Sequence, residues 1–280
     1  MSVGSRDFWG AAALSLLFLL VLLGVWQLAT PPKQHAAGAN DEYAKLMGRG
    51  AKKTEGFPTP SQLGETAWKN LADPFYDRGS NDKGIGIQLA YSLARVGAGY
   101  ALAILFAVPF GFLIGMSPLM HRALDPFIQV LKPISPLAWM PLALYTIKDS
   151  SVSGVFVIFI CSVWPMLINT AHGVASVRRD WLDVARTLEV KTLRRAFRVI
   201  LPAAAPTILT GMRISMGIAW LVIVAAEMLV GGTGIGYFVW NEWNNLNLAN
   251  VIFAILTIGV VGMALDLAIG RLQKLVTYAD

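Results

Sequence analysis

Long apolar runs alternate with short polar stretches along most of the chain. The first run extends from Phe8 to Ala29, and five more lie at about 88–116, 126–147, 152–174, 204–230 and 250–271. About 20 consecutive apolar residues allow a helix to cross the hydrocarbon layer of a bilayer. Because a helix satisfies its own backbone hydrogen bonds in lipid, the pattern predicts an all-α integral membrane protein with six transmembrane helices.

The first apolar run has an alternative interpretation as a signal peptide. Residues Ala37–Ala39 read AGA, which resembles a cleavage site. However, the run is longer than the roughly 7–15 apolar residues of a signal sequence. The charge that precedes it is also weak, because Asp7 offsets Arg6. These features favour a retained transmembrane helix over residues 1–30.

The composition agrees with a membrane protein and argues against a nucleic-acid partner. Hydrophobic residues make up 55% of the 280 residues and charged residues 14%, whereas soluble domains carry roughly 25% charged residues. The net charge is +6, but seven of the 23 basic residues lie between Arg178 and Arg198. Such a local basic block beside apolar runs is typical of a cytoplasmic membrane loop. Cys161 is the only cysteine and lies in an apolar run, so we expect no disulfide framework.

The distribution of Lys and Arg also predicts the orientation in the membrane, because short basic loops stay in the cytoplasm. Residues 174–200 hold seven basic residues, and the segment 31–85 holds eight over twice that length. Placing the first of these in the cytoplasm puts both termini there, including the tail 276–280. The segment 31–85 then faces outward, as do residues 231–249. Within the segment 31–85, the stretch PTPSQLGETAWKNLADPF predicts a short amphipathic helix at the membrane surface.

The basic loop between the fourth and fifth apolar runs has a helical pattern of its own. It reads RRDWLDVARTLEVKTLRRAFRVILP, from Arg178 to Pro202, and Asp180 and Thr192 are candidate N-caps. Apolar residues recur at helical spacing in two stripes, Trp181, Ala185 and Leu188, then Leu193, Phe197 and Ile200. We therefore expect two short helices joined by a turn after Glu189, the second ending at Pro202. The pattern fits either lipid headgroups or a protein partner.

The same loop resembles the cytoplasmic loop of ABC importer permeases. That family loop reads Glu-Ala-Ala, three residues, Gly, nine residues, Ile, one residue, Leu-Pro. The chain has Asp183, Val184 and Ala185 at the first three positions and Val199, Leu201 and Pro202 at the last. It departs from the family at Glu189, where a Gly usually stands. A side chain in a left-handed turn position costs roughly 1–2 kcal/mol, so the turn geometry here is expected to differ.

The flanking stretches are similar to permeases of the nitrate, sulfonate and taurine importers. These stretches are DPFIQVLKPISPLAWMPLAL, VFVIFICSVWPMLINTAHGV and GMRISMGIAWLVIVAAEMLVGGTGIGYFVWNEWN. The last two resemble most the branch that includes the nitrate/nitrite, cyanate and bicarbonate permeases. The resemblance covers about residues 86–275, and it implies a type I ABC importer permease fold that works as a dimer. It also implies a five-helix core over these residues, with a cytoplasmic coupling loop at 176–200.

This resemblance implies a transmembrane permease subunit of an ATP-driven importer of a small inorganic anion. Nitrate or nitrite is the anion that the resemblance favours. Bicarbonate, cyanate, taurine and alkanesulfonate are the alternatives. The implied partners are a second copy of the chain, two cytoplasmic ABC ATPase subunits and an extracytoplasmic solute-binding protein, in the lipid of a bacterial inner membrane. The residues implied to couple to the ATPase are Asp183, Val184, Ala185, Arg186, Leu188, Glu189, Leu201 and Pro202.

The chain itself lacks the motifs for ATP chemistry or catalysis. No G-x-x-x-x-G-K-[ST] phosphate loop occurs, so ATP and Mg²⁺ would be bound by a partner ATPase, and we expect no cofactor here. The three histidines, His35, His121 and His172, have no ligand-spaced Cys or acidic neighbours, so a metal site or an enzyme is not expected. GGTGIG at 231–236 lacks nucleotide-binding spacing and predicts a flexible turn. An ATP-independent carrier is the alternative from a different class.

Lys132 is a candidate for the translocation path, because charged residues inside apolar runs are costly in lipid. It precedes PISPLAWMP, where Pro133, Pro136 and Pro141 are expected to break or kink the helix. Broken helices at membrane depth occur beside protein or a water-filled cavity, where a cation suits an anion. The alternative is that Lys132 snorkels to the cytoplasmic surface.

Arg213 and Glu227 are further charged residues within one predicted helix. They are fourteen residues apart, or about 21 Å at 1.5 Å per residue, so they cannot pair with each other. Each could lie on the path or pair with another span, whereas Arg95 and Asp266 are expected near span ends in structural roles. The predicted path residues are Lys132, Trp139, Met140, Arg213 and Glu227.

Overall fold

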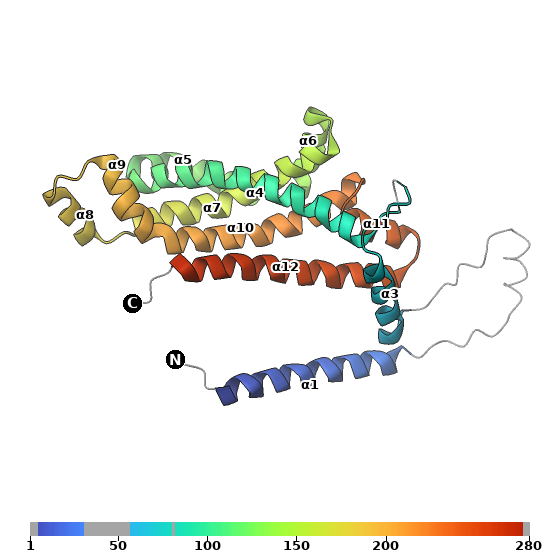
Figure 1. The fold of residues 1–280 in the computed structure, drawn as a ribbon. Helices are drawn as coiled ribbons and strands as arrows, with labels where there is room; N and C mark the ends of the chain where they lie inside the picture. Colours follow the sequence, from blue (N-terminus) through green and yellow to red (C-terminus); the bar gives the residue numbers. More distant parts are fainter. Residues whose placement is uncertain (1–4, 31–56, 80–81, 277–280) are drawn as a thin grey trace, which may run out of the picture.

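The computed structural model describes residues 5–30, 57–79 and 82–276, and its regular elements there are helices. Five of these helices are long and apolar enough to cross a membrane. They are α1 (Ser5–Ala29), α4 (Ile85–Met116), α7 (Ser150–Ala175), α10 (Leu201–Val230) and α12 (Leu248–Val276), shown in Figure 1. The predicted all-α membrane fold is thus confirmed.

The predicted span at 126–147 differs from the others, because the structure divides it between two helices. α5 (Pro118–Leu131) begins earlier than expected, and α6 (Pro136–Ile147) follows it at an angle of 90°. If this bent pair counts as one span, the described residues hold six. The break coincides with Pro133 and with Pro136 at the start of α6, as the sequence predicts, because proline removes a backbone N–H and clashes with the preceding turn.

α7 is the central helix and packs against both α4 and α10. Its side chains Val157, Ile158 and Met166 are almost fully buried. Glycines let α4 approach it closely, because a Cβ atom at Gly99 would lie 2.8 Å from the Ile158 side chain. Close packing of small residues is a common way to hold helices together in lipid, where no hydrophobic force drives them together.

α3 (Pro60–Ala72) lies across the ends of α1 and α12 (Figure 1). The Thr59 hydroxyl accepts a hydrogen bond from the backbone N–H of Gln62, and the Gln62 side-chain oxygen accepts one from the backbone N–H of Thr59. This reciprocal arrangement is a capping box. Trp26 Nε1 of α1 donates to Pro58 O at 3.1 Å, and Asn70 Nδ2 donates to Asn250 Oδ1 at 3.0 Å. The short helix predicted in the segment 31–85 is therefore present, and it ties α1 to the bundle.

Two groups of elements mark the two ends of the bundle (Figure 1). α8 (Arg179–Thr187) and α9 (Thr192–Arg195) lie at one end, which we call the loop end, together with the start of α1 and the end of α12. α3 and α11 (Ile235–Asn244) lie at the opposite end. The loop, the start of α1 and the end of α12 thus share a side. Residues 31–56, with the AGA at Ala37–Ala39, and 277–280 lie outside the described residues.

Candidate functional site

The loop end carries the two short helices that the sequence predicts, but their boundaries differ from the prediction. Arg178 and Lys191, rather than Asp180 and Thr192, occupy the N-cap positions. Asp180 instead lies in the first turn of α8 and pairs with Arg178 at 3.1 Å, where its charge still suits the helix dipole.

The second helix was also predicted to end at Pro202, and this is wrong. α9 continues through a π-helical turn, η1 (Ala196–Ile200), directly into α10. Leu201 N donates to Ala196 O, one residue further back than in an α-helix. Pro202 is in the first turn after this wider segment, where its missing N–H is tolerated. A continuous helix therefore joins the loop to the centre of the bundle.

Glu189 adopts the left-handed backbone conformation that the family glycine would occupy, with φ of +50°. Its N–H donates to Arg186 O at 2.9 Å, and Val190 N–H donates to Ala185 O at 3.0 Å. These two bonds form a Schellman motif, which usually places Gly at the left-handed residue. The turn is thus preserved despite Glu189, and strain of roughly 1–2 kcal/mol accompanies it.

α8 packs on the bundle through one narrow face and exposes Trp181 and Val184. Ala185 is buried, and Leu182 contacts the small cluster around Val174 and Ile200. Five large apolar side chains of this segment are exposed, and we call them the loop surface: Trp181, Val184, Leu188, Leu193 and Phe197. The two predicted stripes are thus only partly buried. The loop surface therefore leaves these apolar side chains uncovered by the rest of the described chain.

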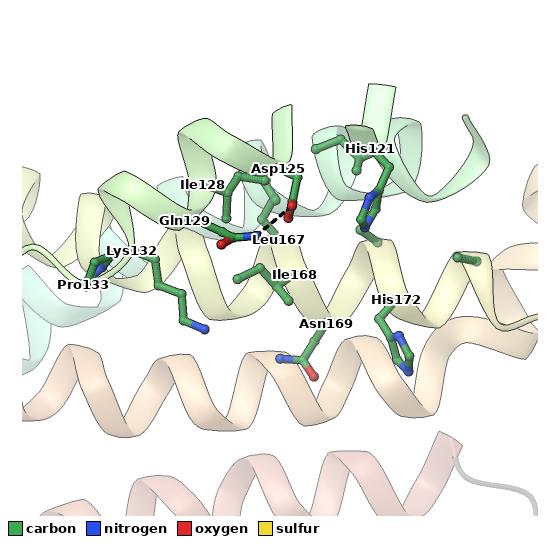
Figure 2. Close-up of a pocket in the computed structure, with 13 residues that line it drawn as sticks. His121, Asp125, Ile128, Gln129, Lys132, Pro133, Leu167, Ile168, Asn169 and His172 are labelled. Carbon is green, nitrogen blue, oxygen red and sulfur yellow. Dashed lines mark hydrogen bonds between the residues drawn. The ribbon is translucent and has the colours of Figure 1, made fainter. Parts of the chain in front are cut away.

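A cavity of about 750 Å³ lies in the half of the bundle nearer the loop end, between α5, α7 and the end of α4. Figure 2 shows polar side chains around it, contributed by both α5 and α7. The polar side chains that line it are His121, Asp125, Gln129, Lys132, Asn169 and His172. The lining thus holds one carboxylate, one lysine, two histidines and two side-chain amides.

Several contacts hold these polar groups in place. Gln129 Nε2 donates to Asp125 Oδ2 at 2.7 Å, along one face of α5 (Figure 2). Asn169 Nδ2 donates to Pro165 O at 2.7 Å. Lys132 is the C-cap of α5, so the break that the sequence predicts brings its ammonium group to the cavity. The arrangement offers several hydrogen-bond donors and a positive charge to a small anion.

Arg213 and Glu227 do not line this cavity, and each forms an ion pair with another span. Arg213 Nε and Nη2 lie 2.6 and 2.5 Å from the two carboxylate oxygens of Asp266 on α12. Glu227 is buried and pairs with Arg95 of α4 at 2.7 Å. The alternative that the sequence left open for both residues, a pair with another span, is therefore present in the structure.

Trp139 and Met140 pack against the apolar core, and Met140 is almost fully buried. Lys132 is thus the only one of the five predicted path residues that borders the 750 Å³ cavity. The other polar lining residues of α5 were missed. His121, Asp125, Gln129 and Lys132 recur at intervals of four, four and three residues, which is one helix face. His121 and Asp125 precede the apolar run predicted at 126–147, and Gln129 is an uncharged residue within it.

The family model described as "Binding-protein-dependent transport system inner membrane component" matches residues 107–278. The nitrate import permease protein NrtB of Synechocystis sp. is 44% identical over 224 residues, covering 80% of this chain and 82% of the relative. The bicarbonate transport system permease protein CmpB of the same organism is 44% identical over 227 residues, covering 79% and 80%.

Solved structures show the same fold at low sequence identity. The MetNI methionine ABC transporter in inward-facing conformations matches with a TM-score of 0.61 and 13% identity, covering 68% of this chain and 94% of that chain. An amino acid ABC transporter matches with a TM-score of 0.53 and 16% identity, covering 67% and 90%. These likenesses confirm the predicted type I permease fold. Within the described residues, no group of three or more His, Cys, Asp or Glu side chains could hold a metal ion.

Proposed function

The chain belongs to the family of binding-protein-dependent transport system inner membrane components, and we propose that it is the permease subunit of an ATP-driven importer of a small inorganic anion. Nitrate is the first candidate cargo. The observation that carries this proposal is the 44% identity to a nitrate import permease over 80% of the chain. Members of this family are transport components rather than enzymes.

The loop surface is proposed to dock on a cytoplasmic ATPase subunit that binds ATP and Mg²⁺. Its support is the exposure of Trp181, Leu188 and Phe197 at one end of the bundle. Because α9 and η1 run directly into α10, a displacement of the docked loop would be transmitted along the continuous helix to α10. Two copies of the chain with two ATPase subunits would then open and close the path together.

Docking is tested by comparing Trp181→Ala with Trp68→Ala, an exposed tryptophan of α3 at the opposite end. Each variant is purified with its candidate ATPase subunits and reconstituted for uptake. Trp181→Ala is expected to lower both ATPase co-purification and uptake by about tenfold, the effect of a moderate interface residue. Trp68→Ala should leave the ATPase bound. Normal co-purification and uptake with Trp181→Ala would refute the docking proposal.

The 750 Å³ cavity is proposed as the loop-end part of the anion path. Lys132 supplies a positive charge there, and Gln129 and Asn169 supply amide groups. We expect Lys132→Gln to lower nitrate uptake by about tenfold, equivalent to about 1.4 kcal/mol, while the ATPase stays bound. Lys148→Gln, an exposed lysine after α6, is the matched control. Equal uptake by both variants would remove Lys132 from the path.

Bicarbonate is the second candidate cargo, because a bicarbonate permease is as similar to this chain as a nitrate permease. Nitrate only accepts hydrogen bonds, whereas bicarbonate also donates one. Asp125, the acidic side chain of the cavity lining, is an acceptor that only bicarbonate would use. Uptake of nitrate, bicarbonate, cyanate, taurine and an alkanesulfonate by the reconstituted complex tests the cargo. Uptake without ATP would instead support a carrier.

The proposed location is a bacterial inner membrane, with the loop end in the cytoplasm and α3 and α11 outside. This orientation is supported by the basic loop and by the position of the start of α1 and the end of α12 on the same side as that loop. In a Cys161→Ser background, single cysteines at Ser61 and Thr187 would report the two sides. An impermeant thiol reagent added outside whole cells should label the first cysteine and leave the second unlabelled. The reverse labelling would overturn the orientation.

A further inference from the structure

A cluster of polar side chains is enclosed in apolar surroundings near the outer ends of α4 and α10. Gln88, Ser92 and Arg95 follow one face of α4 at helical spacing. Ser92 and Arg95 bind Glu227 of α10, and Gln88 binds the backbone of Gly234 beside it. Gln88, Ser92 and Glu227 are buried, with exposures of 2%, 0% and 4%. We call these four residues the Glu227 clamp. Buried polar groups at such a depth call for an explanation of what they hold.

The Glu227 carboxylate has hydrogen-bond donors from three directions. Ser92 Oγ donates to it and lies 2.9 and 2.8 Å from its two oxygens. Arg95 Nη1 donates to it at 2.7 Å, and the backbone N–H of Gly236 donates at 3.0 Å. Because every partner is a donor and one is cationic, an ionised carboxylate is compensated at this buried position.

The same side chains also hold the backbone that leads into α11. Gly234 N–H donates to Gln88 Oε1 at 2.6 Å, and Ile235 N–H donates to Ser92 Oγ at 2.9 Å. Arg95 Nη1 donates to Thr233 O at 2.6 Å. The first N–H groups of a helix have no partner within the helix, and here α4 and α10 supply those partners. The flexible turn predicted for 231–236 is therefore wrong for its second half.

Two glycines of GGTGIG make this close approach possible. A Cβ atom at Gly234 would overlap the Glu227 carboxyl group, and one at Gly236 would overlap the backbone oxygen of Val224. The turn itself is made earlier, at Gly231 and Gly232, which have φ of +78° and +95°. The glycines of this stretch thus divide into two that bend the chain and two that let it touch α10.

Arg95 extends the cluster to a third span, because its Nε donates to Ser151 Oγ of α7 at 3.0 Å. The space beside Arg95 and Glu227 measures about 10 Å³, the lower limit for a single water molecule. The polar groups of the clamp are therefore tightly packed around one another in this structure. α11, in contrast, exposes Trp240 and Trp243 at the end of the molecule opposite the loop (Figure 1).

We propose that the Glu227 clamp is a positioning site that fixes the start of α11 to α4 and α10. α11 and the outer ends of these spans then move as one body during transport. A soluble partner pressing on α11 would thereby act on the spans directly. The role in transport rests on the proposed function, whereas the fixed position of α11 does not.

Hydrogen exchange tests the fixed position in the purified, full-length permease. The amides of Gly234, Ile235 and Gly236 are expected to exchange slowly in the wild type. Glu227→Gln puts an amide NH₂ among donors, and Ser92→Ala removes the acceptor for Ile235. Each should speed exchange at these three amides about tenfold or more. Asp266→Asn, which alters the other ion pair of α10, should leave them unchanged.

Fast exchange of these amides in the wild type would overturn the proposal, as would identical rates in Glu227→Gln and the wild type. The transport role is tested in nanodiscs that contain the permease, its ATPase and its binding protein. Glu227→Gln is expected to lower the ratio of binding-protein-stimulated to basal ATPase rate at least about fivefold. An unchanged ratio would overturn the transport role. If the wild type itself shows no stimulation, the proposed function fails while the exchange result still decides the clamp.

Discussion

α10 contributes one partner to each of two ion pairs. Glu227 binds Arg95 of α4, and their side chains are only 4% and 13% exposed. Arg213 binds Asp266 of α12, and those side chains are 44% and 49% exposed. In the sequence the two residues look alike, since each is a single charge inside the same apolar run.

The difference lies in what surrounds each pair. Glu227 and Arg95 also bind Ser92, Thr233 and the backbone of Gly236, so removing one partner strands a buried charge. Arg213 and Asp266 bind each other side by side and remain open to their surroundings. A buried charge that loses its partner has nothing to replace it, whereas a half-exposed charge can still be approached by groups from outside the chain. We therefore expect the loss of one partner to cost more stability in the Glu227 clamp than in the Arg213–Asp266 pair.

Arg95→Ala should produce the largest loss of stability. It leaves the Glu227 carboxylate buried without its cation, which costs about 3–5 kcal/mol. The thermal unfolding midpoint of the purified permease measures the effect, with Asp266→Ala as the matched change in the other pair. Equal midpoint shifts for the two variants would break the comparison. The double variant Arg95→Met, Glu227→Gln should recover part of the loss, because no unpaired charge remains.

Gly236→Ala should come second. Its Cβ atom would overlap Val224 O, and overpacking of this kind costs about 1–3 kcal/mol. Gly217→Ala on the same α10 is the control, because no atom lies within 4 Å of its Cβ position. We expect a lower unfolding midpoint only for Gly236→Ala, together with faster hydrogen exchange at Ile235. A stable Gly236→Ala variant with slow exchange would mean that the close approach is dispensable.

Glu189→Gly should have a smaller effect of opposite sign, at the loop end. Removing the side chain from a left-handed position relieves roughly 1–2 kcal/mol of strain, while the Schellman bonds to Arg186 O and Ala185 O are retained. The gain is local, so hydrogen exchange at Val190 is the measurement, and slower exchange is expected. Faster exchange there would show that the Glu189 side chain contributes contacts that outweigh the strain.

Asp266→Asn should have the smallest effect of the series. Both partners of its pair are about half-exposed, and Asn retains an oxygen that can accept from Arg213. We expect an unfolding midpoint close to that of the wild type. A loss as large as that of Arg95→Ala would show that the Arg213 side of α10 is as enclosed as the clamp.

The sequence predicted some features of the site because they depend on neighbours along the chain. Proline spacing after Lys132 predicted the break between α5 and α6. Loop spacing from Asp183 to Pro202 predicted the family. The altered turn expected at Glu189 was predicted wrongly, because Glu189 itself adopts the left-handed conformation. The end of the second loop helix was predicted wrongly, because a π-helical turn at Ala196–Ile200 carries the chain past Pro202. Such a turn has no simple pattern of residues.

By itself, then, the sequence determined the helical membrane fold, the position of the loop and the family, because apolar periodicity and motif spacing are local properties. Tertiary structure alone decided the partners of the intramembrane charges. Arg95 and Glu227 are 132 residues apart in the chain. Periodicity relates only residues within one helix, so it could not pair these two. Their pairing follows from the packing of α4 against α10, because buried charges need hydrogen-bond partners that are close in space. The same packing holds the second half of GGTGIG in place.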